Sequence, residues 1–165
     1  MKKRFKMAVD KRVGIGFNGE VSRINSSFCE SAHIKKNNIP NYGTAVKYDG
    51  IFLSPLDPND NAQKICGFFV RHYPSHSYDE LAILTNAGDY NFTANVLKSG
   101  YMTVYIDSPT DIKRGDPVYI RVANPNENSP LGSVVTTEID AVLLPNAYFV
   151  SEVDSDNIAE ISFKI

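Results

Sequence analysis

Apolar and polar residues alternate with a period of two in several short segments of this chain. The alternation is clearest in Tyr101–Ile106 and in Ile158–Ile165. Because successive side chains of a β-strand point to opposite faces, this period predicts strands with one buried face. Ile65–Arg71 is apolar and aromatic on both faces, which predicts a central strand covered on both sides.

Two turn signals divide further strand-like segments. Asp49-Gly50 predicts a tight hairpin, since glycine readily takes the positive φ that such turns require. Lys98-Ser99-Gly100 predicts a second hairpin by the same reasoning. The remaining predicted strands are Thr44–Tyr48, Ile51–Leu53, Asn91–Leu97, Val118–Ala123, Ser133–Thr137 and Ala147–Val150.

Helical periodicity is nearly absent. Ser77–Ala87 predicts one short helix at most, or a turn and a strand. Many short strands joined by Pro, Gly, Asn and Asp clusters are typical of an all-β fold. We therefore expect a single-domain barrel or jelly-roll-like sandwich over residues 14–165, with an extended N-terminal arm over residues 1–13. A chain of 165 residues is long enough to bury its own core without a metal or disulfide.

Charge is distributed unevenly, although the net charge is only −2. The first twelve residues carry six cations against one acid, whereas the segment from Glu138 onward carries six acids against Lys164 alone. This pattern fits either two solvated stretches or an electrostatic contact within or between subunits. The balanced total charge gives no reason to expect a nucleic-acid partner.

Cysteine content and hydropathy bear on the cellular compartment in which the protein is made. Cys29 and Cys66 are too few for a disulfide framework and lack metal-site spacing, so we expect free thiols in a reducing compartment. The charged N-terminus does not resemble a secretion signal, and no apolar run reaches membrane-spanning length. The expectation is a soluble protein made in a cytoplasm, with no membrane partner.

Two motifs invite a ligand-binding interpretation. Gly14–Gly19 spells G-x-G-x-x-G, but a dinucleotide site needs that run between a buried strand and a helix, and neither is predicted here. We expect the glycines to serve a loop that lies flat against another surface. His72 and His76 have the i, i+4 spacing of metal ligands on a helix, but Pro74 between them is incompatible with that helix.

Catalytic signatures are also lacking. The chain has no G-x-S-x-G elbow, neither cysteine stands in a nucleophile context, and the carboxylates lie mainly in predicted loops and the acidic C-terminal part. We therefore predict no catalytic, cofactor-binding or metal site, and a protein that is not an enzyme.

The order of segments resembles the structural cement, or capsid decoration, proteins of tailed bacteriophages. The resemblance runs from about Gly14 to Ile165. It rests on six short segments in sequence: Tyr42–Val46, Gly67–Arg71, Gly100–Val104, Gly115–Tyr119, Asn146–Phe149 and Ala159–Phe163.

This resemblance implies a virion protein on the capsid exterior, synthesised in the host cytoplasm, that cements neighbouring subunits of the major capsid protein. It implies self-association as a homodimer or homotrimer, with no cofactor and no catalysis. The candidate interface residues are Lys2, Lys3, Arg4, Phe5, Lys6, Lys11, Arg12, Phe17, Tyr42, Arg71 and Tyr73.

Two alternatives stay open at this point. One is a phage tail or baseplate β-module that binds a host glycan, which an exposed aromatic cluster beside a carboxylate would favour. The other is a small all-β hydrolase, which a buried carboxylate or histidine with a shifted pKa in a cleft would favour. An apolar patch near the basic arm would favour the capsid protein.

Overall fold

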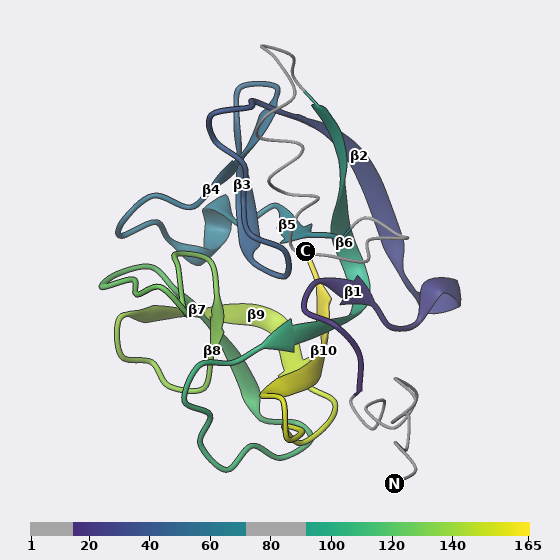
Figure 1. The fold of residues 1–165 in the computed structure, drawn as a ribbon, viewed down its shortest axis with the longest axis vertical. Coiled ribbons are helices and arrows are strands. Elements are labelled where there is room, and N and C mark those ends of the chain that lie inside the picture. Colours follow the sequence, from purple (N-terminus) through teal and green to yellow (C-terminus); the bar gives the residue numbers. More distant parts are fainter. Residues whose placement is uncertain (1–14, 72–91) are drawn as a thin grey trace, which may run out of the picture.

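A computed structural model describes residues 15–71 and 92–165. Its strands form one ten-stranded sheet, and the helical elements of these ranges are two single 3-10 turns, η2 (Ile24–Ser26) and η3 (Ala62–Lys64) (Figure 1). The strands are β1 (Glu20–Val21), β2 (Phe28–Ile34), β3 (Ala45–Asp49), β4 (Phe52–Pro55), β5 (Gly67–Phe69), β6 (Phe92–Tyr105), β7 (Pro117–Arg121), β8 (Val134–Val135), β9 (Ala141–Phe149) and β10 (Ile158–Lys164). The predicted all-β fold is confirmed. The predicted helix at Ser77–Ala87 lies outside the described residues.

The first half of the long strand β6 closes a small ring of strands. It pairs with β2 on one side and with β5 on the other, and β5 leads through β3 and β4 back to β2. Among the pairings of the described strands, only that of β2 with β4 is parallel, with His33 opposite Phe52 and Ile34 opposite Leu53. The sheet thus closes on itself over these five strands, which is the barrel-like part of the molecule.

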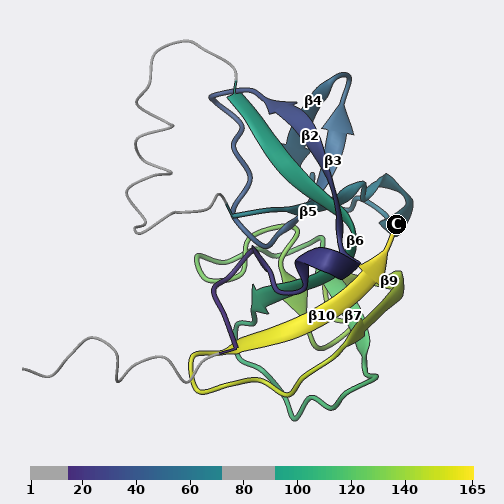
Figure 2. The same ribbon diagram turned by 90° about the vertical axis from the view of Figure 1, so that its right-hand side faces the viewer.

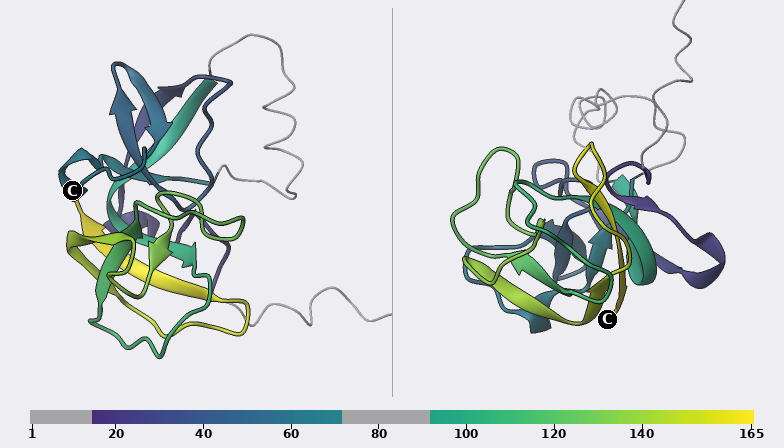
Figure 3. Two further views of the ribbon diagram at one scale, coloured as in Figure 1. Left: turned by 90° about the vertical axis from the view of Figure 1, so that its left-hand side faces the viewer. Right: turned by 90° about the horizontal axis from the view of Figure 1, so that it is seen from below.

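The second half of β6 continues into a second, open layer. It pairs with β10 and with the short β1, and the sheet continues from β10 to β9, β7 and β8. Seen from the sides, the ring stacks above this layer, and β6 runs through both (Figures 2 and 3). Because one strand belongs to both parts, the position of the ring relative to the second layer is set covalently.

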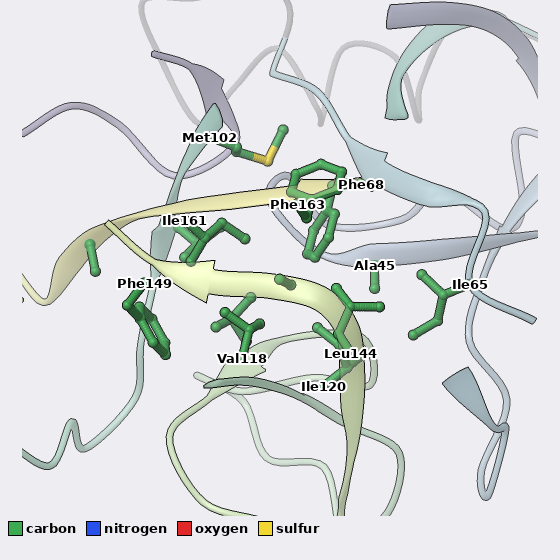
Figure 4. Close-up of a cluster of buried hydrophobic side chains, with 14 of the residues drawn as sticks. Ala45, Ile65, Phe68, Met102, Val118, Ile120, Leu144, Phe149, Ile161 and Phe163 are labelled. Carbon is green, nitrogen blue, oxygen red and sulfur yellow. The ribbon is translucent and has the colours of Figure 1, made fainter. Parts of the chain in front are cut away.

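Two clusters of apolar side chains form the core. The smaller fills the ring and includes Val46, Phe69 and Val96. The larger lies between the ring and the second layer, where the rings of Phe68 and Phe163 lie 4.5 Å apart (Figure 4). Burying a phenylalanine side chain stabilises a fold by about 2–3 kcal/mol, so contacts of this kind hold the two parts together as one body.

The hairpin predicted at Lys98–Gly100 is wrong, because β6 runs through these residues without turning. Gly100 has a φ of +130° and lies against the backbone of Ser27, so a Cβ there would come within 2.6 Å of the Ser27 Cα. The Ser27 hydroxyl accepts a hydrogen bond from the Tyr101 amide. This glycine therefore permits a close approach between two segments and is not a turn residue.

Candidate interaction surface

The glycine-rich segment at the start of the described chain is fastened to β6. The Gly19 amide donates to the Thr103 carbonyl at 2.8 Å. The Asn18 side chain accepts from the Tyr105 amide at 2.9 Å and donates to the Tyr42 carbonyl at 2.7 Å. Residues 15–19 are thereby held between β6 and the turn at residues 41–43, so the surface that this segment lies against is the protein's own, and Gly19 is buried there.

Two glycines make this packing possible. Gly19 and Gly43 have φ values of +80° and +72°, and a Cβ on Gly19 would lie 2.7 Å from the Gly43 nitrogen. A Cβ on Gly43 would lie 2.2 Å from the Asn18 side-chain oxygen. After Gly19 the chain enters β1 and not a helix, so the helix N-terminus that a dinucleotide site requires is missing from this place.

This packing brings Phe17, Tyr42 and Arg71 together. The Arg71 guanidinium carbon lies 5.3 Å from the centre of the Phe17 ring and 5.8 Å from that of Tyr42. Tyr42 stacks on the buried Phe69 at 5.2 Å. The Arg71 amide donates to the Gly19 carbonyl, which fixes the end of β5 against the glycine segment. We call Phe17, Tyr42 and Arg71 the aromatic–arginine cluster.

The cluster presents an apolar and cationic surface. Phe17 is 53% exposed, whereas Tyr42 is half-buried. A guanidinium above an aromatic face is held by the electrostatic attraction between the cation and the ring, worth about 0.5–1 kcal/mol at exposed sites. Arginine and aromatic residues are also the types enriched at the centres of protein–protein interfaces.

Three of the eleven residues predicted for the interface, Phe17, Tyr42 and Arg71, are thus brought together. The other eight lie outside the described residues: Lys2, Lys3, Arg4, Phe5, Lys6, Lys11, Arg12 and Tyr73. The described chain begins at Ile15, whose amide donates to the Asp154 carboxylate at 3.0 Å. Ile15 therefore lies two residues from Phe17 in sequence and next to the acidic turn after β9.

A second group of polar and aromatic residues, which the sequence analysis missed, lies on the outer face of β10. Arg23 donates to both carboxylate oxygens of Glu160, at 3.0 and 2.7 Å, and Ser22 donates to one of them at 2.6 Å. The Arg23 guanidinium covers the Tyr101 ring at 4.2 Å. Burial alone would raise the pKa of Glu160, but the hydrogen bonds from Arg23 and Ser22 outweigh it, so this pKa is lowered.

A third group surrounds Asp60, which is 3% exposed. Its carboxylate accepts from Lys47 and Lys64, both at 2.6 Å, and from the Asp57 amide at 2.8 Å. Burial would raise the pKa of Asp60, yet these bonds outweigh it and lower the pKa to about 2. A carboxylate held ionised in this way is a structural anion and is poorly suited to general acid–base catalysis near neutral pH.

Both cysteines are free thiols, with Cys29 exposed and Cys66 half-buried. Within residues 15–71 and 92–165, no group of three or more His, Cys, Asp or Glu side chains is placed to hold a metal ion. His72 and His76 lie outside these ranges. The same ranges contain no helix that is long and apolar enough to span a bilayer.

Comparison with known proteins places the chain in a family. The family model of the XM1 gp53 minor capsid protein matches residues 6–163. The chain belongs to this family. It is thus a capsid-associated structural protein, which confirms the resemblance to capsid proteins of tailed phages at the level of the family.

A solved structure shares the fold of this minor capsid protein. A chain of "The capsid of Myoviridae Phage XM1" superposes with a TM-score of 0.72 at 19% identity, covering 98% of each chain. No match was found among curated proteins. The aromatic–arginine cluster and the arm therefore stand on a β-body that a phage capsid chain also has.

Proposed function

We propose that this minor capsid protein binds the outer surface of a phage shell and cements neighbouring subunits of the major capsid protein. The observation that carries the proposal is the aromatic–arginine cluster, in which an exposed Phe17 lies next to Arg71, four residues after the basic arm in sequence. Such a surface suits a protein partner, because aromatic residues and arginine are enriched at the centres of protein–protein interfaces.

The proposal includes no catalysis, no cofactor and no nucleic-acid partner. The protein would be made in the host cytoplasm and would reach the virion by binding shells. Self-association as a dimer or trimer would let several modest contacts act together across the shell, so that avidity exceeds the affinity of one copy.

Neither alternative is favoured at the aromatic–arginine cluster, at Glu160 or at Asp60, although Tyr48, which is 38% exposed, does donate a hydrogen bond to the exposed Glu30 carboxylate at 3.4 Å. A glycan reader needs an exposed aromatic beside an accessible carboxylate, but the aromatic–arginine cluster holds a cation, and Glu160 near Tyr101 is 8% exposed with Arg23 and Ser22 bound to it. A hydrolase would use a carboxylate whose pKa is raised toward neutrality, and the pKa of Asp60 is shifted the other way.

Co-sedimentation with empty shells of the parent phage tests this proposal. The variant Phe17→Ala/Arg71→Ala should lose shell binding while keeping the wild-type circular dichroism spectrum. Ile139→Ala and Lys113→Ala are matched controls, since Ile139 is 72% exposed and the Lys113 side chain is 74% exposed, both away from the cluster in sequence. Binding by the cluster variant equal to that of the controls would overturn the proposed role of the cluster.

A further inference from the structure

Residues 17–20 form a tight turn whose two central residues are Asn18 and Gly19. The Glu20 amide donates to the Phe17 carbonyl at 3.1 Å, and Gly19 has a φ of +80°, which the third residue of a type II turn requires. Asn18 is the one asparagine in the sequence that is followed by glycine. The turn therefore contains a dipeptide with a chemistry of its own, which the proposed function does not use.

Asn-Gly is the sequence at which asparagine deamidates most readily. The glycine nitrogen attacks the side-chain carbonyl carbon of the asparagine, ammonia leaves, and a succinimide ring forms. Water then opens the ring to aspartate or isoaspartate, so that in total one amide and one water become a carboxylate and ammonium. Glycine favours the attack because no Cβ hinders the approach to its nitrogen. In the unfolded chain, Asn18 should therefore react before the other asparagines.

The docked turn holds both reacting groups in other contacts. The Gly19 amide, which contains the attacking nitrogen, is buried and donates to the Thr103 carbonyl at 2.8 Å. The Asn18 side chain donates to the Tyr42 carbonyl at 2.7 Å and accepts from the Tyr105 amide at 2.9 Å. The Asn18 side chain therefore cannot turn onto the Gly19 nitrogen until these three hydrogen bonds break.

The segment of residues 15–19 can open without unfolding of the sheet. It precedes β1 and is attached to β6 and to the turn at residues 41–43 by the hydrogen bonds of individual residues. Its large apolar side chains contribute little burial, since Ile15 and Phe17 are 40% and 53% exposed. Segments of this kind open at a lower free-energy cost than the core strands.

We propose that Asn18 is a deamidation site controlled by the docking of residues 15–19. The docked segment protects Asn18, and the open segment lets it react. The product re-docks poorly, because an ionised carboxylate has no N–H to donate to the Tyr42 carbonyl and places negative charge against that oxygen. Since Phe17 belongs to the segment, each modified copy loses the arrangement of the aromatic–arginine cluster. Deamidation thus converts a transient opening into a permanent loss of that surface.

Peptide mapping by mass spectrometry tests this inference on the free, full-length protein, so that its outcome does not depend on shell binding. The gain in mass from replacing –NH2 by –OH is followed at Asn18 and Asn25, in native buffer and in urea. Asn25 is the internal reference, because it is exposed in η2 and is followed by serine. A reaction of the open state follows the open fraction, so folding should lower the ratio of the Asn18 rate to the Asn25 rate at least tenfold, roughly.

A variant that loosens the segment should speed the reaction in the native protein. Thr103→Val removes a hydroxyl that donates to the Phe17 carbonyl at 2.6 Å, and the native rate at Asn18 should rise about two- to tenfold. Thr110→Val, at an exposed position outside this contact, is the matched control and should leave the rate unchanged.

A second variant reproduces the product. In Asn18→Asp, hydrogen exchange of the Gly19 amide reports re-docking, because the docked segment bonds this amide to the Thr103 carbonyl. Exchange should be about tenfold faster than in the wild type, whereas Asn25→Asp should leave it unchanged.

The outcomes separate the parts of the proposal. Equal rate ratios in native buffer and urea, or an unchanged native rate in Thr103→Val, would overturn the control by docking. An Asn18 that does not react in urea would overturn the site itself. Wild-type exchange at Gly19 in Asn18→Asp would show that the product re-docks and would overturn the permanent loss of the surface.

Discussion

At the residue scale, Asp60 shows how a buried charge serves the fold. Its carboxylate oxygens accept hydrogen bonds from Lys47, Lys64 and the Asp57 amide, so one carboxylate connects the loop after β4 to β3 and η3. The Lys47 side chain is itself only 12% exposed, and Asp60 is its buried anionic partner, since its other partner, Asp57, is exposed. Removing one member of such a group leaves the other charge unpaired, which costs more than the pair contributes.

We expect Asp60→Asn to lower the free energy of unfolding by about 2–4 kcal/mol at pH 7, because Lys47 then keeps only the exposed Asp57 as an anionic partner and Lys64 loses its ion pair. Urea unfolding measures this. Asp57→Asn is the control, since the Asp57 side chain is 76% exposed and its bond to the same lysine is worth about 0–1 kcal/mol. Equal losses from the two variants would contradict a special role for Asp60.

The low pKa of Asp60 also predicts a pH dependence. The pKa is about 2 in the fold against an ordinary value of 3.8. A lowered pKa contributes stability that is fully present above the ordinary value and is lost as pH falls through the folded value. Up to about 2 kcal/mol should disappear between pH 4 and pH 2 in the wild type, and this component should be absent from Asp60→Asn. Parallel pH profiles of the two proteins would refute this.

Gly100 allows a second residue-scale prediction. Gly100→Ala places a methyl group against Ser27 and adds the strain of positive φ, whereas Gly115→Ala, at φ +96°, meets nothing within 4 Å. The first change should destabilise by about 2–4 kcal/mol and the second by about 1 kcal/mol. Thermal unfolding of the two variants compares them, and a difference near zero would show that Ser27 moves away without cost.

At the scale of elements, sequence periodicity predicts strands well where one face is buried in the core. The strand predicted at Ile158–Ile165 is confirmed as β10, with Ile161 and Phe163 buried and Lys164 exposed, but the alternation is incomplete, because Glu160 is buried beneath Arg23 and Ile165 is exposed. β2 was not predicted, because its first four residues are exposed on both faces and the sequence there lacks the alternation of apolar and polar residues. The predicted hairpin within β6 failed because a glycine needed for close packing has the same sequence signature as one needed for a turn.

The candidate surface was partly predictable. Phe17, Tyr42 and Arg71 were each predicted as interface residues, but their proximity to one another was not. That proximity depends on the packing of Gly19 against Gly43, a contact between segments that are distant in sequence, and no local sequence pattern predicts such a contact. The Arg23–Glu160 pair spans 137 positions and was missed for the same reason.

The Arg23–Glu160 pair gives a prediction for the β1–η2 segment. Arg23→Ala removes two hydrogen bonds to Glu160 and the cover over Tyr101. We expect faster amide hydrogen exchange at Ser22, whose amide bonds the Tyr101 carbonyl, with little change in the ring strands. Lys113→Ala, in an exposed pair with Asp111, is the control and should leave exchange unchanged. Unaltered exchange at Ser22 in Arg23→Ala would assign the anchoring of this segment to its backbone bonds alone.

At the scale of the whole molecule, we predict that the arm contributes to shell binding and that the body folds without it. Six cations among the first twelve residues cannot build a core. Deleting residues 1–12 should therefore leave the thermal unfolding of the body nearly unchanged while it reduces shell binding. The binding of the intact protein should also weaken with added salt, since exposed charges are screened over about 8–10 Å at physiological ionic strength. A truncated protein that fails to fold would make the arm part of the body.

The proposed binding of this minor capsid protein to the shell exterior, where it would bridge major capsid protein subunits, can be observed by electron cryomicroscopy of the parent phage's empty shells with and without added protein. We expect additional density on the outer surface that fits the ring and second layer of this β-body. Each copy should contact at least two major capsid subunits through the side bearing Phe17 and Arg71. Density confined to the shell interior or the tail, or copies that each contact a single subunit, would contradict it.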